Sequence, residues 1–221
     1  MVILTDLSEV FISGIYGTEK ILATKFGDEA GKLFWDQHNK TYIEFENLMR
    51  GRMTEKEYWD IFFKKGEYPF TYKDVNEAFA ENLRKTIPDT ADMYQRIISH
   101  PRHVGSAIDM VEGVPTIYLV SDHIRERIQF IKKSHKCLFK LFADEFWSFK
   151  IGKIKRDPGF FSNLLSKLNL RPEEVVFIDD SQVNINMATF AGVHSILFRN
   201  ADQVENMLKN CYRFEFTPKK P

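Results

Sequence analysis

Two short apolar runs near opposite ends of the chain each finish on carboxylates. Residues 2–5 precede Asp6, and residues 175–178 precede Asp179 and Asp180. Apolar runs without alternation are typical of strands buried on both faces of a parallel sheet, and ligands bind beyond the carboxyl ends of such strands. Carboxylates gathered there repel one another unless a cation compensates them, and an oxygen-rich cluster suits Mg²⁺. The alternative interpretation makes each Asp a turn residue or a helix cap.

A hydroxyl and an ammonium group are expected at the same edge of the sheet. The apolar run 116–121 ends on Ser121, and a later loop carries Lys150, Lys153 and Lys155. A nucleophilic carboxylate, a metal site, a lysine and a hydroxyl together are what phosphoryl transfer to Asp requires. Taken singly, Ser121 is equally compatible with a helix cap, and the lysines with a solvated turn.

Four sequence motifs in this order resemble those of the haloacid dehalogenase superfamily, which consists mostly of aspartyl-phosphate phosphatases. The similar segments are ILTDLSEV at 3–10, YLVSD at 118–122, SFKIGKIKRDP at 148–158 and VFIDDS at 176–181. Asn184, Ala188 and Gly192 extend the last motif, and residues 50–54 resemble part of the cap of a subfamily whose lid follows the first strand. The resemblance covers nearly the whole chain.

The resemblance implies a role for each candidate residue. Asp6 would be the nucleophile, and its carboxylate, Asp180 and the backbone carbonyl of Ser8 would hold Mg²⁺. The catalytic set would be Asp6, Ser8 and Lys155, the substrate-binding set Ser121, Asp122 and Lys155, and the metal set Asp6, Ser8, Asp179 and Asp180. Within the metal set, Asp179 would support the waters on the ion.

Two positions depart from the pattern of the superfamily. Many of its phosphatases have a second Asp two residues after the nucleophile as a general acid, and this chain has Ser8 there. A serine hydroxyl has no useful acidity near neutral pH, so a poor leaving group would receive little assistance. Arg156 stands where proline usually follows the lysine.

The elements that position these residues form an α/β pattern. Strands are expected at 116–121, 138–142, 175–178 and 195–198, alternating with helices at 123–134, 159–168, 182–191 and 201–210, which predicts a Rossmann-like doubly wound parallel sheet. Pro158 is expected in the first turn of the helix from 159. A further helix is expected at 89–100, and residues 102–113 have no clear assignment.

Residues 18–86 have helical periodicity almost throughout, with about four helices and no strand. Thr54 and Glu57 have the spacing of a capping box, and Thr71 begins another helix. The predicted organisation is a catalytic core of residues 1–14 and 89–221 with an all-helical cap of residues 15–88.

Composition narrows the class of protein. The 31 basic residues balance the 31 acidic ones, which argues against binding to nucleic acid or an anionic membrane through bulk charge. Cys137 and Cys211 have no metal-ligand spacing, and we see neither a membrane span nor a signal peptide. The sequence therefore predicts a cytoplasmic monomer or homodimer.

The predicted function is a Mg²⁺-dependent phosphatase that acts through an aspartyl-phosphate intermediate. Its expected substrate is a small phosphorylated metabolite, for example a sugar phosphate. Two alternatives remain at this point. Ser8 is compatible with a weak or inactive member that has a binding or regulatory role, and a 2-haloacid dehalogenase would use Asp6 on carbon without a metal.

Overall fold

A computed structural model describes residues 1–64, 66–98 and 115–217 of the chain. Its centre is a five-stranded parallel sheet with the order β3-β2-β1-β4-β5. The strands are β1 (Val2–Thr5), β2 (Ile117–Ser121), β3 (Asp144–Trp147), β4 (Val175–Asp179) and β5 (His194–Leu197). This arrangement confirms the predicted α/β sheet and places β1 and β4 side by side.

The sheet has a hydrophobic core on each face, and each strand contributes to both because successive side chains point to opposite sides. Ile3 of β1 and Val176 of β4 belong to one hydrophobic core, and Leu4 and Phe177 belong to another. All four side chains are fully buried. The unbroken apolar runs at the start of each motif therefore reflect burial on two faces.

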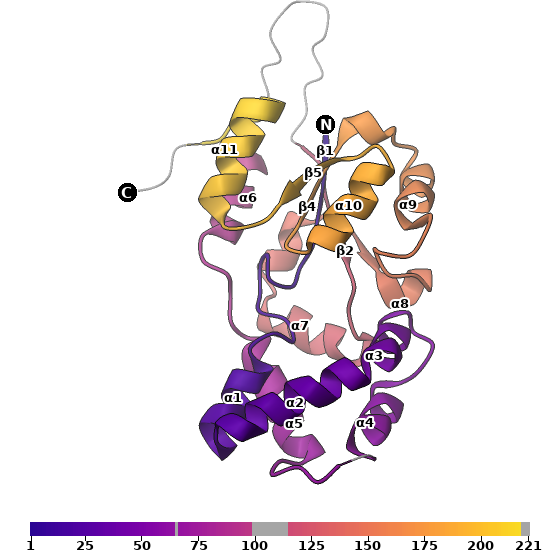
Figure 1. Ribbon diagram of the computed structural model, residues 1–221. Helices are drawn as coiled ribbons and strands as arrows, with labels where there is room; N and C mark the ends of the chain where they lie inside the picture. The colour runs from indigo at the N-terminus through magenta and orange to yellow at the C-terminus, as the bar shows by residue number, and fades with distance from the viewer. Residues whose placement is uncertain (65, 99–114, 218–221) are drawn as a thin grey trace, which may run out of the picture.

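The flanking helices divide between these two cores (Figure 1). Helices α6 (Thr90–Ile98), α7 (Ile128–Ser134) and α11 (Ala201–Tyr212) contribute to the first core, and α9 (Phe160–Leu168) and α10 (Gln182–Phe190) to the second. Short helices complete the connections: α8 (Ser148–Ile151) and the 3₁₀ turns η1 (Arg125–Arg127), η2 (Leu138–Leu141) and η3 (Pro172–Glu174).

Five helices connect β1 to α6: α1 (Thr18–Phe26), α2 (Asp28–Lys40), α3 (Tyr42–Met49), α4 (Glu55–Phe63) and α5 (Tyr72–Asn82). They gather beyond the carboxyl ends of the strands (Figure 1). The capping box of Thr54 and Glu57 is confirmed, and Thr71 caps α5 in the same way with Asp74. Aromatic side chains such as Tyr58 and Phe62 fill the space between these helices. The division into cap and core at residues 14 and 88 stays a prediction.

The prediction of a strand at 138–142 is wrong. Residues 138–141 form the 3₁₀ turn η2, in which the N–H of Leu138 donates to the carbonyl of His135. The strand lies further on, where β3 pairs only with β2 at the edge of the sheet. An edge strand that begins with the exposed Asp144 lacks the apolar run that marks the inner strands.

Two helix starts also differ from the prediction. The segment expected as a helix from 123 begins as η1 and becomes α-helical only at Ile128. Helix α9 begins at Phe160 after Gly159, whose positive φ of 75° suits glycine, so Pro158 precedes the helix instead of lying in its first turn. Helix α6 ends at Ile98 within the described part of the chain, and the predicted end at 100 and residues 102–113 lie outside it.

No helix in residues 1–64, 66–98 or 115–217 combines the length and the apolar character that crossing a membrane requires.

Candidate active site

Asp6 lies at the carboxyl end of β1, beside β4. The N–H of Asp6 donates to the carbonyl of Ile178 at 2.9 Å, which extends the β1–β4 pairing to the first residue after the strand. The side chain is 8% exposed, and its Oδ1 lies 2.9 Å from Nζ of Lys155. The first and third motifs were expected at the same edge of the sheet, and the structure brings Asp6 and Lys155 together there.

Lys155 is the lysine of its loop that reaches the site. Its side chain is buried, and Nζ also lies 2.6 Å from Oδ2 of Asp179. Burial opposes the charged form, but Asp179, Asp6 and Asp122 outweigh it and raise the pKa of Lys155 above its usual value. The ammonium group therefore stays charged at neutral pH.

The other two lysines of the loop point elsewhere. Nζ of Lys153 donates to the carbonyl of Pro158 at 3.0 Å, and the side chain of Lys150 is exposed. Asp122 holds the loop from the opposite side, because its two carboxylate oxygens each accept the N–H of Lys155 at 3.1 Å. Asp122 also lines the pocket, and burial raises its pKa to about 7.

Asp179 and Asp180 end β4 in different environments. Asp179 is fully buried, and its Oδ1 accepts the N–H of Ser181 at 2.8 Å and Nδ2 of Asn184 at 3.0 Å. Asp180 is partly exposed and lines the pocket, and burial together with Asp6 and Asp179 raises its pKa to about 7. The first carboxylate therefore anchors Lys155 and the start of α10, whereas the second faces the pocket.

Side-chain oxygens of Asp6, Asp179 and Asp180 all lie within 4.8 Å of one another. Within the described residues, Oδ1 of Asp6 has no well-directed hydrogen bond although it lies close to Lys155. Three carboxylates with one ammonium group leave an excess of negative charge, which a divalent cation with oxygen ligands would compensate. The donor set fits Mg²⁺.

Ser121 and Ser8 complete the predicted set. The hydroxyl of Ser121 at the end of β2 is buried and finds no hydrogen-bond partner among the described residues. Ser8 lines the pocket two residues after Asp6. Of the seven predicted site residues, five line one pocket (Asp6, Ser8, Asp122, Lys155 and Asp180), whereas Ser121 and Asp179 do not. Their individual roles stay predictions.

The pocket has a volume of about 140 Å³ and lies between the sheet edge and the helices that follow β1. Its charged side comes from the ends of the strands, and the facing side comes from α2, α3 and α5. These facing residues could not be selected from the sequence, because helical periodicity assigns their aromatic side chains equally well to a core.

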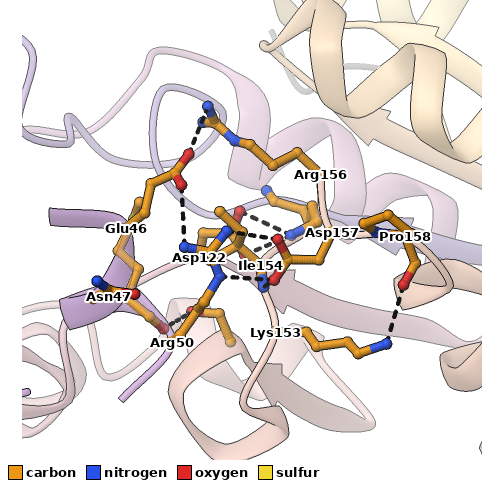
Figure 2. A network of polar contacts seen from close by, with 12 residues as sticks. Glu46, Asn47, Arg50, Asp122, Lys153, Ile154, Arg156, Asp157 and Pro158 are labelled. Atoms are coloured by element: carbon orange, nitrogen blue, oxygen red, sulfur yellow. Dashed lines mark hydrogen bonds and ion pairs between the residues drawn. The ribbon is translucent and has the colours of Figure 1, made fainter. Parts of the chain in front are cut away.

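A network of ion pairs joins α3 to the Lys155 loop (Figure 2). Arg50 donates to Asp157 through Nε at 2.8 Å and through Nη2 at 2.6 Å. Glu46 lies 3.1 Å from Arg156, and Oδ2 of Asp157 accepts the N–H of Ile154 at 3.0 Å. These contacts bracket Lys155, and they explain how an arginine is accommodated after that lysine.

This network could not be predicted from the sequence, because Arg50 and Asp157 are 107 residues apart. No local spacing rule connects positions so distant. The departure at Arg156 was the one visible signal, and it indicated a change in the loop without indicating a partner.

Comparison with curated proteins finds two distant relatives. The chain is 26% identical over 175 residues to drimenol cyclase drtB of Aspergillus calidoustus, covering 79% of this chain and 30% of that protein. It is 34% identical over 74 residues to flavin mononucleotide hydrolase 1 of Arabidopsis thaliana, covering 32% of this chain and 30% of that protein. The matches thus span about 30% of the length of each relative. No protein-family model matches the chain.

Solved structures of low sequence identity share the fold. HAD-hydrolase YfnB from Bacillus subtilis, bound to magnesium, superposes with a TM-score of 0.66 at 15% identity over 94% of this chain and 98% of that one. HAD family enzyme bt-2542 from Bacteroides thetaiotaomicron, in complex with magnesium and inorganic phosphate, gives 0.64 at 16% identity over 90% and 93%. The chain has the fold of the haloacid dehalogenase (HAD) superfamily. The fold predicted from the four motifs is confirmed.

The same fold also includes an L-2-haloacid dehalogenase from Xanthobacter autotrophicus, with a TM-score of 0.58 at 12% identity over 88% of this chain and 76% of that one. Fold similarity alone therefore does not separate phosphate chemistry from halide chemistry. The residues at the sheet edge must distinguish the two reactions.

Proposed function

We propose that this protein is a Mg²⁺-dependent phosphatase that acts on a small phosphorylated metabolite through an aspartyl-phosphate intermediate. The observation that carries the proposal is the cluster of Asp6, Asp179 and Asp180, whose oxygens lie within 4.8 Å of one another beside the ammonium group of Lys155. An excess of carboxylates at a sheet edge suits a divalent cation, and that cation together with Lys155 would attract the negatively charged phosphoryl group.

Asp6 is the nucleophile in this mechanism. Its carboxylate attacks phosphorus, the bond to the leaving oxygen breaks, and the phosphoryl group is transferred to the carboxylate. Lys155 neutralises charge on the phosphoryl oxygens, and the unpartnered hydroxyl of Ser121 is available to orient them. Water then hydrolyses the acyl phosphate and regenerates Asp6.

Mg²⁺ would be held by Asp6, Asp180 and the backbone carbonyl of Ser8, with Asp179 supporting its waters. When bound, it supplies Lewis-acid stabilisation of the phosphoryl oxygens. The magnesium named in two neighbours of the same fold supports this choice of metal.

Ser8 shapes the expected substrate range. General acid catalysis contributes about 10²–10⁴-fold, and a serine at this position does not supply it. Acyl and aryl phosphates, whose leaving groups need no proton, should therefore react much faster than alkyl phosphates. Ser8→Asp should reduce that difference and help alkyl phosphates most.

The experiment is Mg²⁺-dependent release of phosphate from p-nitrophenyl phosphate, compared between wild type and Asp6→Asn. Asn keeps the shape of Asp but is not a nucleophile, so turnover should fall by several orders of magnitude while the circular dichroism spectrum is retained. Equal turnover by both proteins would reject the mechanism.

Dehalogenation is the second candidate, and the shared fold with the Xanthobacter autotrophicus dehalogenase favours it. In that reaction Asp6 would attack carbon and displace halide. This candidate would be selected if chloride were released from 2-chloropropionate in the presence of EDTA and no phosphate were released from any ester. The crowded carboxylates at Asp179 and Asp180 argue against it, because a metal-free reaction leaves their charge uncompensated.

A further inference from the structure

The side of the pocket that faces the carboxylates is built from apolar and aromatic side chains. We call it the helical wall, and it consists of His38 from α2, Tyr42, Phe45 and Met49 from α3, and Phe79 from α5. Phe45, Met49 and Phe79 are each less than a tenth exposed, so they are held in place by packing. The wall offers a leaving group few polar partners.

His38 is part of this apolar surface. Its ring stacks on Trp35 with centroids 5.1 Å apart and meets the edge of Phe45 at 4.7 Å. Its Nδ1 is hydrogen-bonded to the hydroxyl of Tyr58 at 2.9 Å. Burial lowers the pKa of His38 to about 4, so the ring is uncharged at neutral pH. The wall therefore presents no positive charge of its own.

The cations that line the pocket, within the described residues, are Lys155 and Arg156, and both already have carboxylate partners. Lys155 pairs with Asp6 and Asp179. Arg156 lies 3.1 Å from Glu46 and stacks over Tyr42 with its guanidinium carbon 5.3 Å from the ring centre. A second phosphate or a carboxylate on the substrate would find no uncommitted cation in this lining.

We propose that, given the phosphatase function proposed above, the preferred substrates are phosphate monoesters whose leaving group is an uncharged apolar or aromatic body packed against the helical wall. Ring hydroxyls of a sugar would lose water and gain few hydrogen-bond partners there, because only Tyr42 and His38 of the wall carry polar side-chain atoms. The enclosed part of the body is one ring at most, because the pocket of about 140 Å³ also receives the phosphoryl group and a cavity of ~150 Å³ holds one molecule such as benzene. This substrate class differs from the sugar phosphate expected from the sequence.

The first test compares n-hexyl phosphate with glucose 6-phosphate. Both release a primary alkoxide from a six-carbon body, so they differ mainly in polarity and not in leaving-group acidity. We expect kcat/KM to be at least about tenfold higher for the hexyl ester, since several methylene groups become buried. Equal values, or a preference for the sugar phosphate, would overturn the inference while leaving the phosphatase function intact.

The second test assigns the preference to the wall. Met49→Gln introduces a polar amide of similar length into the wall, and Met187→Gln does the same on α10 outside the pocket. The ratio of kcat/KM for the two esters should fall about tenfold in Met49→Gln, as expected for loss of an apolar contact, and stay unchanged in Met187→Gln. An unchanged ratio in well-folded Met49→Gln would contradict the assignment.

A binding measurement separates the inference from the proposed function. Phenylphosphonate and hydroxymethylphosphonate cannot be hydrolysed, and their affinities for the wild-type protein with Mg²⁺ can be compared by calorimetry. We expect phenylphosphonate to bind at least about tenfold more tightly, because a phenyl group is buried. If the protein shows this preference but hydrolyses no ester, the proposed phosphatase function is rejected and the binding role of the helical wall is supported. Equal affinities would reject that binding role.

Discussion

The two sides of the pocket are built by different physical principles. At the sheet edge, Asp122, Lys155 and Asp179 are fixed by hydrogen bonds and ion pairs of 2.6–3.1 Å. On the helical wall, side chains such as Phe45 and Met49 are fixed by packing, with little polar contact to the pocket. Under the proposed function, the sheet edge determines the type of reaction, whereas the helical wall determines the choice of leaving group.

The two sides meet at the ion pairs of α3 with the Lys155 loop (Figure 2). Glu46 belongs to α3, which supplies Tyr42, Phe45 and Met49 to the wall, and Arg50 directly follows this helix. Asp157 and Arg156 belong to the loop that supplies Lys155. A substitution can therefore disturb the charged side, the apolar side or the connection between them, and each should give a different result.

The largest effect on stability should come from Lys155→Met. Removing the ammonium group leaves Asp6 and Asp179 buried without their cation, which costs about 3–5 kcal/mol for a buried ion pair that loses one partner. Urea unfolding at pH 7 in EDTA measures the loss. Lys150→Met, at an exposed position of α8 just before the Lys155 loop, is the matched control and should stay within about 0.5 kcal/mol of wild type. Similar results for both would mean that the buried charges are not compensated by Lys155.

The next effect should come from Asp180→Asn, which should have opposite effects on the stability of the metal-free protein and on its metal binding. The pKa of Asp180 is raised from 3.8 to about 7, mainly by burial, so folding takes up a proton between these pH values. The stability of the metal-free protein should therefore fall as pH rises through this window, and less steeply in the variant. Thermal unfolding in EDTA at pH 4 and pH 8 measures the difference, with the exposed Asp36→Asn as control.

In EDTA at pH 8, Asp180→Asn should be more stable than wild type, and Mg²⁺ should reverse this order. Wild type should gain stability on addition of Mg²⁺, because an ion that binds only the folded protein shifts the equilibrium toward it. Asp180→Asn should gain little, and calorimetry should find its Mg²⁺ binding greatly weakened. Tight binding of Mg²⁺ by the variant would remove Asp180 from the metal site.

The smallest effect should come from Arg50→Gln, which breaks the connection between the two sides. Its two hydrogen bonds to Asp157 are charged on both partners, and their loss should cost about 1–3 kcal/mol. Because Asp157 also accepts the N–H of Ile154 beside Lys155, kcat should fall by about ten- to hundredfold through misplacement of the loop. Arg52→Gln, at an exposed position nearby, should leave both quantities unchanged.

The sheet edge could be predicted from sequence because its signals are local. An apolar run that ends on a carboxylate marks an inner parallel strand, and Asp6 and Asp180 were placed correctly on that basis. The edge strand β3 was misplaced because burial on one side weakens this signal, and the apolar residues 138–142 imitated it. An apolar run is therefore a better predictor of burial than of strand structure.

The helical wall could not be predicted, although the helices could. The spacing of Phe45, Met49 and Phe79 shows that they face inward, but the same spacing is produced by a core and by a pocket. Which helix faces the carboxylates depends on contacts such as Arg50 with Asp157, across 107 positions of the chain. The sequence therefore carries clearer signals for the residues of the sheet edge than for those of the helical wall.

The most direct test of the account is chemical identification of the residue that becomes phosphorylated. Wild-type protein is mixed with Mg²⁺ and acetyl phosphate, quenched in acid and treated with borohydride, which reduces an acyl phosphate of Asp to homoserine. Mass spectrometry of the peptides should find homoserine at Asp6, and none when Mg²⁺ or acetyl phosphate is omitted. Phosphate release without homoserine at Asp6, or with homoserine at Asp122 or Asp180 in its place, would contradict the account.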